Sequence, residues 1–179
     1  KMAKSEGNFF TLSDIVSRGF DPLAYRYLLL TAHYKTQVNF TWNALSGAET
    51  ALDRLRGMIA ELPDGGEICA PCDKKFQAAI RDDLNTAEAL AVVWKLISRD
   101  DVSLADKKAT LLSWDTILGL GLADVRPVEI PPPVQELAEE RARAREANDF
   151  ARADKLRAEI ESLGFEIRDS ETGPKITKK

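Results

Sequence analysis

A mainly α fold is predicted for this sequence: an antiparallel helical bundle followed by a small α/β carboxy-terminal domain with a β-hairpin. Three observations predict it. Apolar residues recur at spacings of three and four over most of the chain, three consecutive prolines interrupt that pattern at Pro131–Pro133, and apolar and polar residues alternate after Gly164. The chain has 179 residues, 44% hydrophobic and 30% charged, which is enough for one good core and a small additional domain.

Capping residues mark the first helices of the bundle. Ser13 can cap a short helix that ends at Gly19, and Asp21 followed by Pro22 is a strong helix start. Another helix follows Thr41, and its apolar stripe is expected to form part of the core. The residues of this stripe are Leu45, Ala48, Leu52, Leu55 and Ile59.

The second half of the bundle follows the same logic. A helical pattern begins at Phe76, and a capping box from Asn85 to Glu88 indicates that the helix restarts there. Ser103 is a further cap, which opens a helix that runs to Gly119. Four or five helices with short connections indicate an antiparallel bundle.

Changes in composition divide the chain into four parts. Residues 1–12 are predicted to be a loop, 13–125 the bundle, 126–133 a stiff proline-rich linker and 134–179 the carboxy-terminal domain. Three consecutive prolines favour an extended chain, so we place the domain boundary there.

The carboxy-terminal domain is expected to contain two helices and a hairpin. Residues 134–147 and 149–163 have helical patterns, and residues 165–177 alternate around a turn-like stretch. An isolated hairpin is marginal in water, so it must pack on the preceding helices. The apolar period of the second helix predicts four buried residues, Phe150, Ala153, Leu156 and Ile160.

Charge and hydropathy restrict the class of protein. The net charge of −4 argues mildly against a protein that binds nucleic acid by electrostatic attraction alone. No apolar run approaches the roughly 20 residues needed to span a bilayer, and the first residues do not resemble a signal peptide. We therefore expect a cytoplasmic protein that does not associate with membranes.

Cys69 and Cys72 form a single C-x-x-C motif. Two cysteines are too few to staple a chain of this size, so disulfide dependence is not expected. A structural zinc needs four ligands, and His33, the sole histidine, is distant in sequence. We therefore predict no metal site and interpret the motif as part of a variable exposed loop.

Lys1-Met2-Ala3-Lys4-Ser5 is the sharpest chemical signal. Two ammonium groups in a loop can follow a triphosphate while negative charge builds up during adenylate formation, and so stabilise the transition state more than the ground state. In isolation such a pair of lysines is far more commonly a solvated surface feature.

Several segments together resemble a known family. The run from Lys1 to Leu12 resembles the signature loop of class I aminoacyl-tRNA synthetases, and residues 19–30 resemble the helix that leads into their helical anticodon-binding bundle. His33-Tyr34, residues 39–42 and residues 81–86 are similar to cysteinyl-tRNA synthetases in particular. The resemblance covers nearly all of the chain and is weaker between Gly57 and Lys75.

The resemblance implies an ATP-dependent cysteine–tRNA ligase as the full-length protein, using Mg-ATP, cysteine and tRNA(Cys). Lys4 matches the loop lysine that contacts ATP, with Lys1 and Ser5 as supporters, and Ala3 stands where the family usually has serine. In the family, the Rossmann catalytic domain and its zinc ligands precede this loop. We therefore expect the chain to be the carboxy-terminal part of a monomeric enzyme, inactive by itself.

The same resemblance implies a set of residues that read the cysteine anticodon, GCA. These are Arg145, Phe150, Asp154 and Asp169. Arginine offers a bidentate fork to guanine, carboxylates accept from base amino groups, and an aromatic face stacks on an unpaired base. Phe150 replaces a tryptophan common in the family. The alternatives are core packing for Phe150, pairing with Glu146 or Asp149 for Arg145, and plain surface positions for the two acids.

Two other functions remain open. A cysteine ligase of mycothiol synthesis shares the lysine loop but has no tRNA to recognise, and the arginine-rich helix after Pro133 argues against it. A non-catalytic RNA-binding or scaffold module would keep the bundle with a vestigial loop. Acid–base chemistry by His33 is not expected, because no nucleophile lies at a meaningful spacing; packing or a contact with the synthetase body fits it better.

Overall fold

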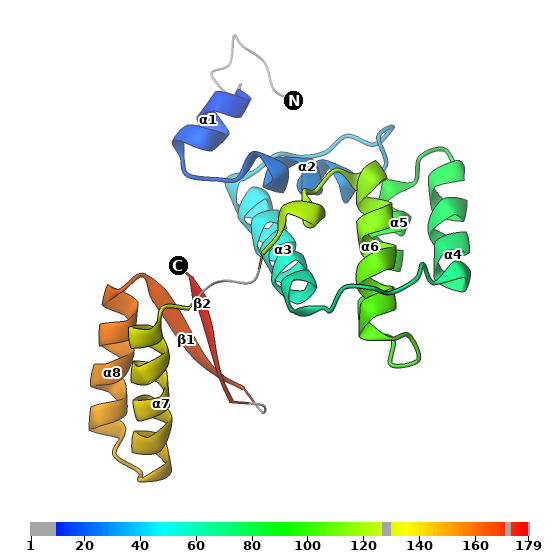
Figure 1. Cartoon of the computed structure of the whole chain (residues 1–179). Coiled ribbons are helices and arrows are strands. Elements are labelled where there is room, and N and C mark those ends of the chain that lie inside the picture. Colours follow the sequence, from blue (N-terminus) through cyan, green and yellow to red (C-terminus); the bar gives the residue numbers. More distant parts are fainter. Residues whose placement is uncertain (1–9, 127–129, 171–172, 179) are drawn as a thin grey trace. The chain divides into compact units, whose positions relative to one another are not determined.

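The structure, a computed structural model, describes residues 10–126, 130–170 and 173–178, with hairpin side chains described at 165–167 and Ile176 (Figure 1). The described chain is mainly α, as predicted. It forms two compact units that divide between Arg126 and Pro127.

The first unit is a helical bundle. Its elements are α1 (Leu12–Ser17), α2 (Pro22–Leu30), α3 (Trp42–Glu61), α4 (Ala70–Arg81), α5 (Thr86–Ile97), α6 (Leu104–Leu118) and the short 3-10 helix η2 (Leu122–Asp124). Four predicted starts are confirmed, because a side-chain oxygen of Asp21, Thr41, Asn85 or Ser103 accepts a hydrogen bond from a backbone N–H in the first turn that follows.

Two helices start elsewhere than predicted. Thr11, not Ser13, caps α1, and it forms a reciprocal capping box with Asp14. The helix α4 begins at Ala70, six residues before Phe76. Its first turn offers few apolar residues to the pattern, but a proline near the start is compatible with a helix because the first N–H groups have no intrahelical acceptor.

The core of the bundle is built around a stacked aromatic pair. Phe76 of α4 and Trp114 of α6 are buried, with ring centroids 4.5 Å apart and planes 5° from parallel. All five residues of the predicted stripe on α3 are buried as well. Figure 1 shows α4, α5 and α6 near one another on the side of the unit away from α1.

Polar contacts fix the end of the bundle that follows α6. Asp115 is nearly buried, and its two carboxylate oxygens accept hydrogen bonds from the backbone N–H groups of Leu120 and Leu122, at 2.7 and 2.8 Å. Arg56 of α3 binds Asp21 at 2.6 Å and the carbonyl oxygen of Leu120 at 3.2 Å. These contacts satisfy backbone groups that the reversal of the chain would otherwise leave unpaired.

The second unit contains α7 (Pro132–Glu146), α8 (Phe150–Ser162), β1 (Phe165–Ser170) and β2 (Gly173–Lys178). The helix α7 begins two residues before Val134, so two of the three prolines lie in its first turn instead of in an extended linker. The strands pair antiparallel, with Ile167 opposite Ile176. The hairpin packs on α7 and α8, as predicted.

The buried face of α8 differs from the prediction at one position. Ala153, Leu156 and Ile160 are buried, but Phe150 is 56% exposed, so the predicted burial of Phe150 is wrong. Phe150 is the first residue of α8. It lies beyond the last turn of α7, so the helix that covers the rest of the stripe does not reach it.

Among the described residues, none of the helices combines the length and apolar character that a membrane span requires. The same residues include no cluster of three or more His, Cys, Asp or Glu side chains arranged to hold a metal ion.

Candidate nucleic-acid interface

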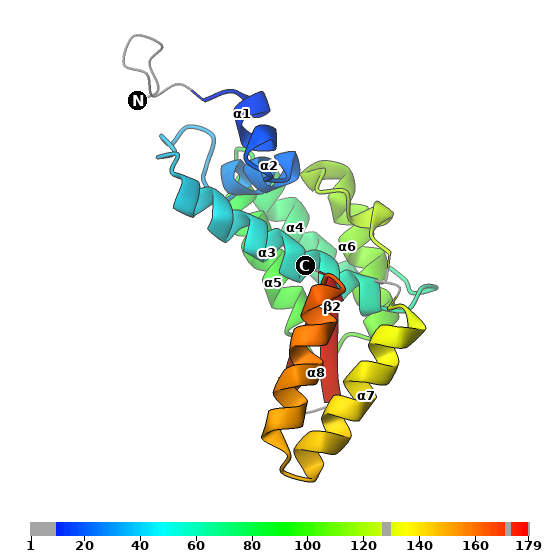
Figure 2. The ribbon, with the colours of Figure 1, turned by 90° about the vertical axis from the view of Figure 1, so that its left-hand side faces the viewer.

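The turn between α7 and α8 forms the tip of a helical hairpin (Figure 2). Asn148 has a left-handed backbone, with φ of 58°, and its N–H donates to the carbonyl oxygen of Arg145 at 2.9 Å. The N–H of Asp149 donates to the carbonyl oxygen of Ala144 at 2.8 Å, and the Asp149 side chain caps α8. Asparagine tolerates this backbone better than most residues. The turn therefore ends one helix and starts the next without a flexible loop.

Three of the residues expected to read an anticodon lie at this tip. Arg145 is in the last turn of α7, Phe150 begins α8, and Asp154 follows one turn later on the same face. All three side chains are exposed. Exposure makes Phe150 available for stacking, which core packing would have prevented.

Asp169, the fourth expected residue, is on β1 opposite Pro174, and its side chain lies outside those described. The strand β1 begins after α8, packs on it and runs back toward the α7–α8 turn (Figure 1). The 13 residues of α8 and the six of β1 both span about 20 Å. Asp169 therefore lies toward the same end of the unit as the α7–α8 turn.

Two arginines that the sequence did not single out lie beside the tip. Arg143 and Arg152 border a shallow cavity of about 270 Å³, and Arg152 also pairs with Glu140 at 3.5 Å. The remaining lining residues are Glu140, Ala144, Ala147 and Asp149. The sequence did contain a signal for Arg152: it lies two positions after Phe150, and the arginine-rich end of α7 lies just before the turn.

Lys1, Lys4 and Ser5 lie outside the described residues, so their expected contact with ATP stays a prediction. The described chain begins with Phe10, whose ring lies 4.9 Å from that of Trp42 and 5.6 Å from that of Phe40. Aromatic contacts thus connect the residue that follows the lysine loop to the start of α3.

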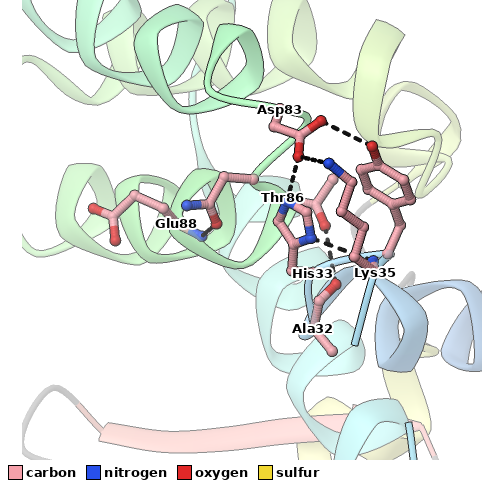
Figure 3. Close-up of polar contacts among 8 residues, drawn as sticks. Ala32, His33, Lys35, Asp83, Thr86 and Glu88 are labelled. Atoms are coloured by element: carbon pink, nitrogen blue, oxygen red, sulfur yellow. Dashed lines mark hydrogen bonds and ion pairs between the residues drawn. The ribbon is translucent and has the colours of Figure 1, made fainter. Parts of the chain in front are cut away.

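Two segments of the family resemblance meet at Asp83 (Figure 3). One Asp83 oxygen accepts a hydrogen bond from the Tyr34 hydroxyl at 2.8 Å, and the other accepts from the Lys35 ammonium group. His33 Nε2 lies 3.6 Å from Asp83. The hydrogen bond from Lys35, followed by that from Tyr34, holds the pKa of the Asp83 carboxyl below its ordinary value of 3.8.

The arrangement around Asp83 fixes a loop. Asp83 has a left-handed backbone, with φ of 53°, at the turn between α4 and α5, and its partners lie in the loop after α2. His33 stacks on Tyr34 with ring centroids 4.8 Å apart, and its Nδ1 accepts from the Lys35 N–H at 3.3 Å. These contacts hold His33 within the loop and give it a packing role.

The interpretation of the C-x-x-C motif as an exposed loop is wrong. Cys69 is the N-cap position of α4, and Cys72 is buried in the core of the bundle, 3% exposed. The sulfurs of the two residues are joined as a disulfide. The helix starts earlier than its apolar pattern suggests, which places the second cysteine on an inward-facing position.

Three family models match consecutive parts of the chain. They are the tRNA synthetases class I (C) catalytic domain at residues 1–50, the DALR domain at 75–123 and the cysteinyl-tRNA ligase anticodon binding domain at 128–174. The last of these includes the α7–α8 tip and most of the hairpin.

Curated relatives match over almost the whole chain. Cysteine–tRNA ligase 1 of Burkholderia lata is 46% identical over 98% of this chain and 38% of its own length. The cysteine–tRNA ligase of Novosphingobium aromaticivorans is 38% identical over 96% of this chain and 38% of its own. The cysteine–tRNA ligase of Chlamydia felis is 38% identical over 99% of this chain and 42% of its own length. The chain thus spans about two fifths of the length of these relatives.

These matches relate the chain to the class I aminoacyl-tRNA synthetases. Within that class the chain belongs to the cysteine–tRNA ligase family and corresponds to its carboxy-terminal part.

The hydrogen bonds at Asp83 predict a pH-dependent contribution to stability. Because the folded-state pKa of Asp83 is lowered, its contribution is complete above the ordinary value of 3.8 and is lost as the pH falls through the folded value. Replacing Asp83 by Asn should lower the melting temperature at about pH 7, and the difference from the unmodified chain should shrink in acid below about pH 3.8.

Thermal unfolding of both chains across this pH range checks the prediction. The matched control is Asp82→Asn, which removes the neighbouring exposed carboxylate. A difference between Asp83→Asn and the unmodified chain that stays constant into acid would show that the carboxylate charge does not contribute.

Proposed function

We propose that this chain is the tRNA-binding carboxy-terminal part of a cysteine–tRNA ligase, an enzyme that activates cysteine with ATP and attaches it to tRNA(Cys). The observation that carries the proposal is the exposed Phe150 at the α7–α8 tip, inside the segment matched by the anticodon-binding model. An exposed aromatic ring next to arginines is the usual means by which proteins hold unstacked RNA bases.

The tip would read the anticodon by complementary contacts. The Phe150 ring would stack on one unpaired base, because every base offers a π face. Arg145, five residues earlier, would donate two hydrogen bonds to the acceptor edge of guanine in GCA. Asp154 and Asp169 would accept from the amino groups of cytosine or adenine.

The positive charge that such a site needs is local. The chain as a whole carries a net charge of −4, and the cavity at the tip is bordered by Arg143 and Arg152 together with Glu140 and Asp149, so single arginines would have to supply the contacts to phosphate. These arginines would contact the phosphates on either side of the bound bases, while the bases carry the sequence information. The affinity would then fall with added salt.

The lysine loop would serve the other half of the reaction. Lys4, supported by Lys1 and Ser5, would contact the phosphates of Mg-ATP bound to a Rossmann catalytic domain, the domain that would also hold the catalytic zinc. Ala3 removes one hydroxyl from this loop, so its ordering would be weaker by about 0.5–1.5 kcal/mol. The protein would act in the cytoplasm as a monomer.

The match of residues 128–174 to an anticodon-binding domain favours this proposal over a ligase that has no tRNA substrate. A non-catalytic module would need no nucleotide loop, and the class I catalytic match at residues 1–50 favours an enzyme.

Truncating Phe150 tests the stacking contact. Phe150→Ala should weaken binding of an anticodon stem-loop of tRNA(Cys) by about 1–3 kcal/mol, and Phe150→Trp should keep or improve it because the stacking face is larger. Fluorescence anisotropy with the labelled stem-loop measures both. Leu163→Ala, which truncates a similarly exposed apolar residue at the far end of α8, is the matched control. Equal affinity of Phe150→Ala and Leu163→Ala would contradict the proposal.

Replacing Arg145 tests base reading. Arg145→Ala should cost about 1–3 kcal/mol on the GCA stem-loop and much less on a loop in which guanine is replaced. Arg145→Lys should not restore discrimination, because an ammonium group lacks the bidentate fork. Arg157→Ala, which removes an arginine from the middle of α8, is the control. A uniform loss on both loops would assign Arg145 to phosphate contact.

A further inference from the structure

The cysteines at the start of α4 are paired. The sulfurs of Cys69 and Cys72 form a disulfide, and the Cα atoms lie 5.3 Å apart, within the usual range for such a bond. Cys69 is the N-cap position and Cys72 is in the first turn of the helix. The electron-deficient N-terminus of a helix stabilises a thiolate, so both sulfurs lie where their reduced forms are favoured.

The two cysteines differ in exposure. Cys69 is partly exposed, and Cys72 is only 3% exposed and belongs to the core of the bundle. A small thiolate therefore reaches Cys69 first. Attack at Cys69 expels Cys72 as the leaving thiolate, and exchange is faster when the leaving thiol has a low pKa.

A cation lies next to the leaving sulfur. Arg99, which follows α5, places Nη1 3.6 Å from Cys72 Sγ, and Asp101 holds the same guanidinium through its Nε at 2.8 Å. Both Cys72 and Arg99 line an open cavity of about 610 Å³ between α4 and α5, whose other charged lining residues are Lys75, Asp82, Glu88 and Lys95. Cys72 is thus buried, but a cation beside its sulfur favours the thiolate that it would form on leaving.

The backbone around the pair is held by bonds that do not depend on the disulfide. The N–H of Cys69 donates to Thr110 Oγ1 of α6 at 2.9 Å, and that of Glu67 donates to Asp106 at 2.8 Å. The carbonyl oxygen of Cys69 accepts from the N–H of Cys72 at 3.0 Å. After reduction these contacts would keep the two thiols close enough to re-form the bond.

We infer that Cys69 and Cys72 form a redox-active pair that exchanges with low-molecular-weight thiols and disulfides. A small thiolate attacks Cys69 Sγ, the sulfur–sulfur bond breaks, and its electron pair passes to Cys72 Sγ, next to Arg99. A second small thiolate attacks the small thiol's sulfur in the mixed disulfide and releases Cys69. Two small thiols thereby supply two electrons and two protons and leave as their disulfide, and the reverse reaction re-oxidises the pair.

Equilibration of the full chain in glutathione buffers tests the inference without any substitution. Free thiols are trapped with a maleimide and counted by mass. The disulfide and the dithiol should interconvert reversibly as the ratio of reduced to oxidised glutathione changes, while circular dichroism stays constant. A pair that keeps one state across the whole range of ratios would overturn the inference.

Single-cysteine variants test the direction of attack. Cys72→Ser leaves Cys69 alone and should take up one glutathione from its disulfide, whereas Cys69→Ser should react at least about tenfold more slowly because Cys72 is buried. Equal rates for the two variants would overturn the assignment of Cys69 as the attacked sulfur.

Variants of Arg99 test the role of the cation. Arg99→Gln should slow reduction of the disulfide by glutathione about threefold to tenfold, and Arg99→Lys should recover most of the rate because it keeps a positive charge near Cys72. Lys74→Gln, which removes an exposed cation from α4, the helix that carries Cys72, is the control for net charge. Equal slowing by Arg99→Gln and Lys74→Gln would remove Arg99 from the mechanism.

Discussion

The burial of one face of α8 is the constraint on which the form of the α7–α8 tip depends. Ala153, Leu156 and Ile160 are buried, Ile160 in one cluster with residues of α7 and β1, and burial of Leu156 and Ile160 contributes about 1.5–3 kcal/mol each. Their positions fix the rotation of the helix. The left-handed Asn148 then fixes where α8 begins, so Phe150 has no helix to cover it. An exposed aromatic ring in this unit is therefore a consequence of its core.

Polar contacts hold two turns of the helical bundle in place. Asp115 satisfies two backbone N–H groups after α6, and Arg26 of α2 donates to the carbonyl oxygens of Leu118 and Ile117. At another turn Asp83 holds the loop after α2. These contacts restrain the loop after α2 and the turn after α6.

Local patterns predicted the elements well and the tertiary contacts poorly. The caps at Asp21, Thr41, Asn85 and Ser103 were correct because N-capping depends on residues within one turn. The partners of Asp83 could not be predicted, since Tyr34 is 49 residues away and no period links the two. The same limit explains the burial of Cys72, which depends on the packing of α4 on its neighbours.

At Phe150 the apolar period of the helix and the tertiary surroundings of the residue lead to different predictions. Its spacing from Ala153 placed it on the buried stripe, and the family resemblance placed it against a base; only the end of α7 decides between them. The resemblance identified Arg145 and Asp154 at the same tip. Arg143 and Arg152 were identified only because the structure shows them lining the cavity between the two helices. The apolar period of a sequence indicates which face of a single helix is buried, whereas this cavity is formed by residues of two helices.

Direct contact between Phe150 and an anticodon base is the central claim. It is tested most directly by placing 2-aminopurine at the adenine of GCA in a tRNA(Cys) anticodon stem-loop, and by recording its fluorescence as the chain is added. A base stacked on the Phe150 ring should change its emission at saturation, and a saturated complex of Phe150→Ala should lack that change. The same emission change in both complexes would contradict the claim, because the base would then be held by other groups.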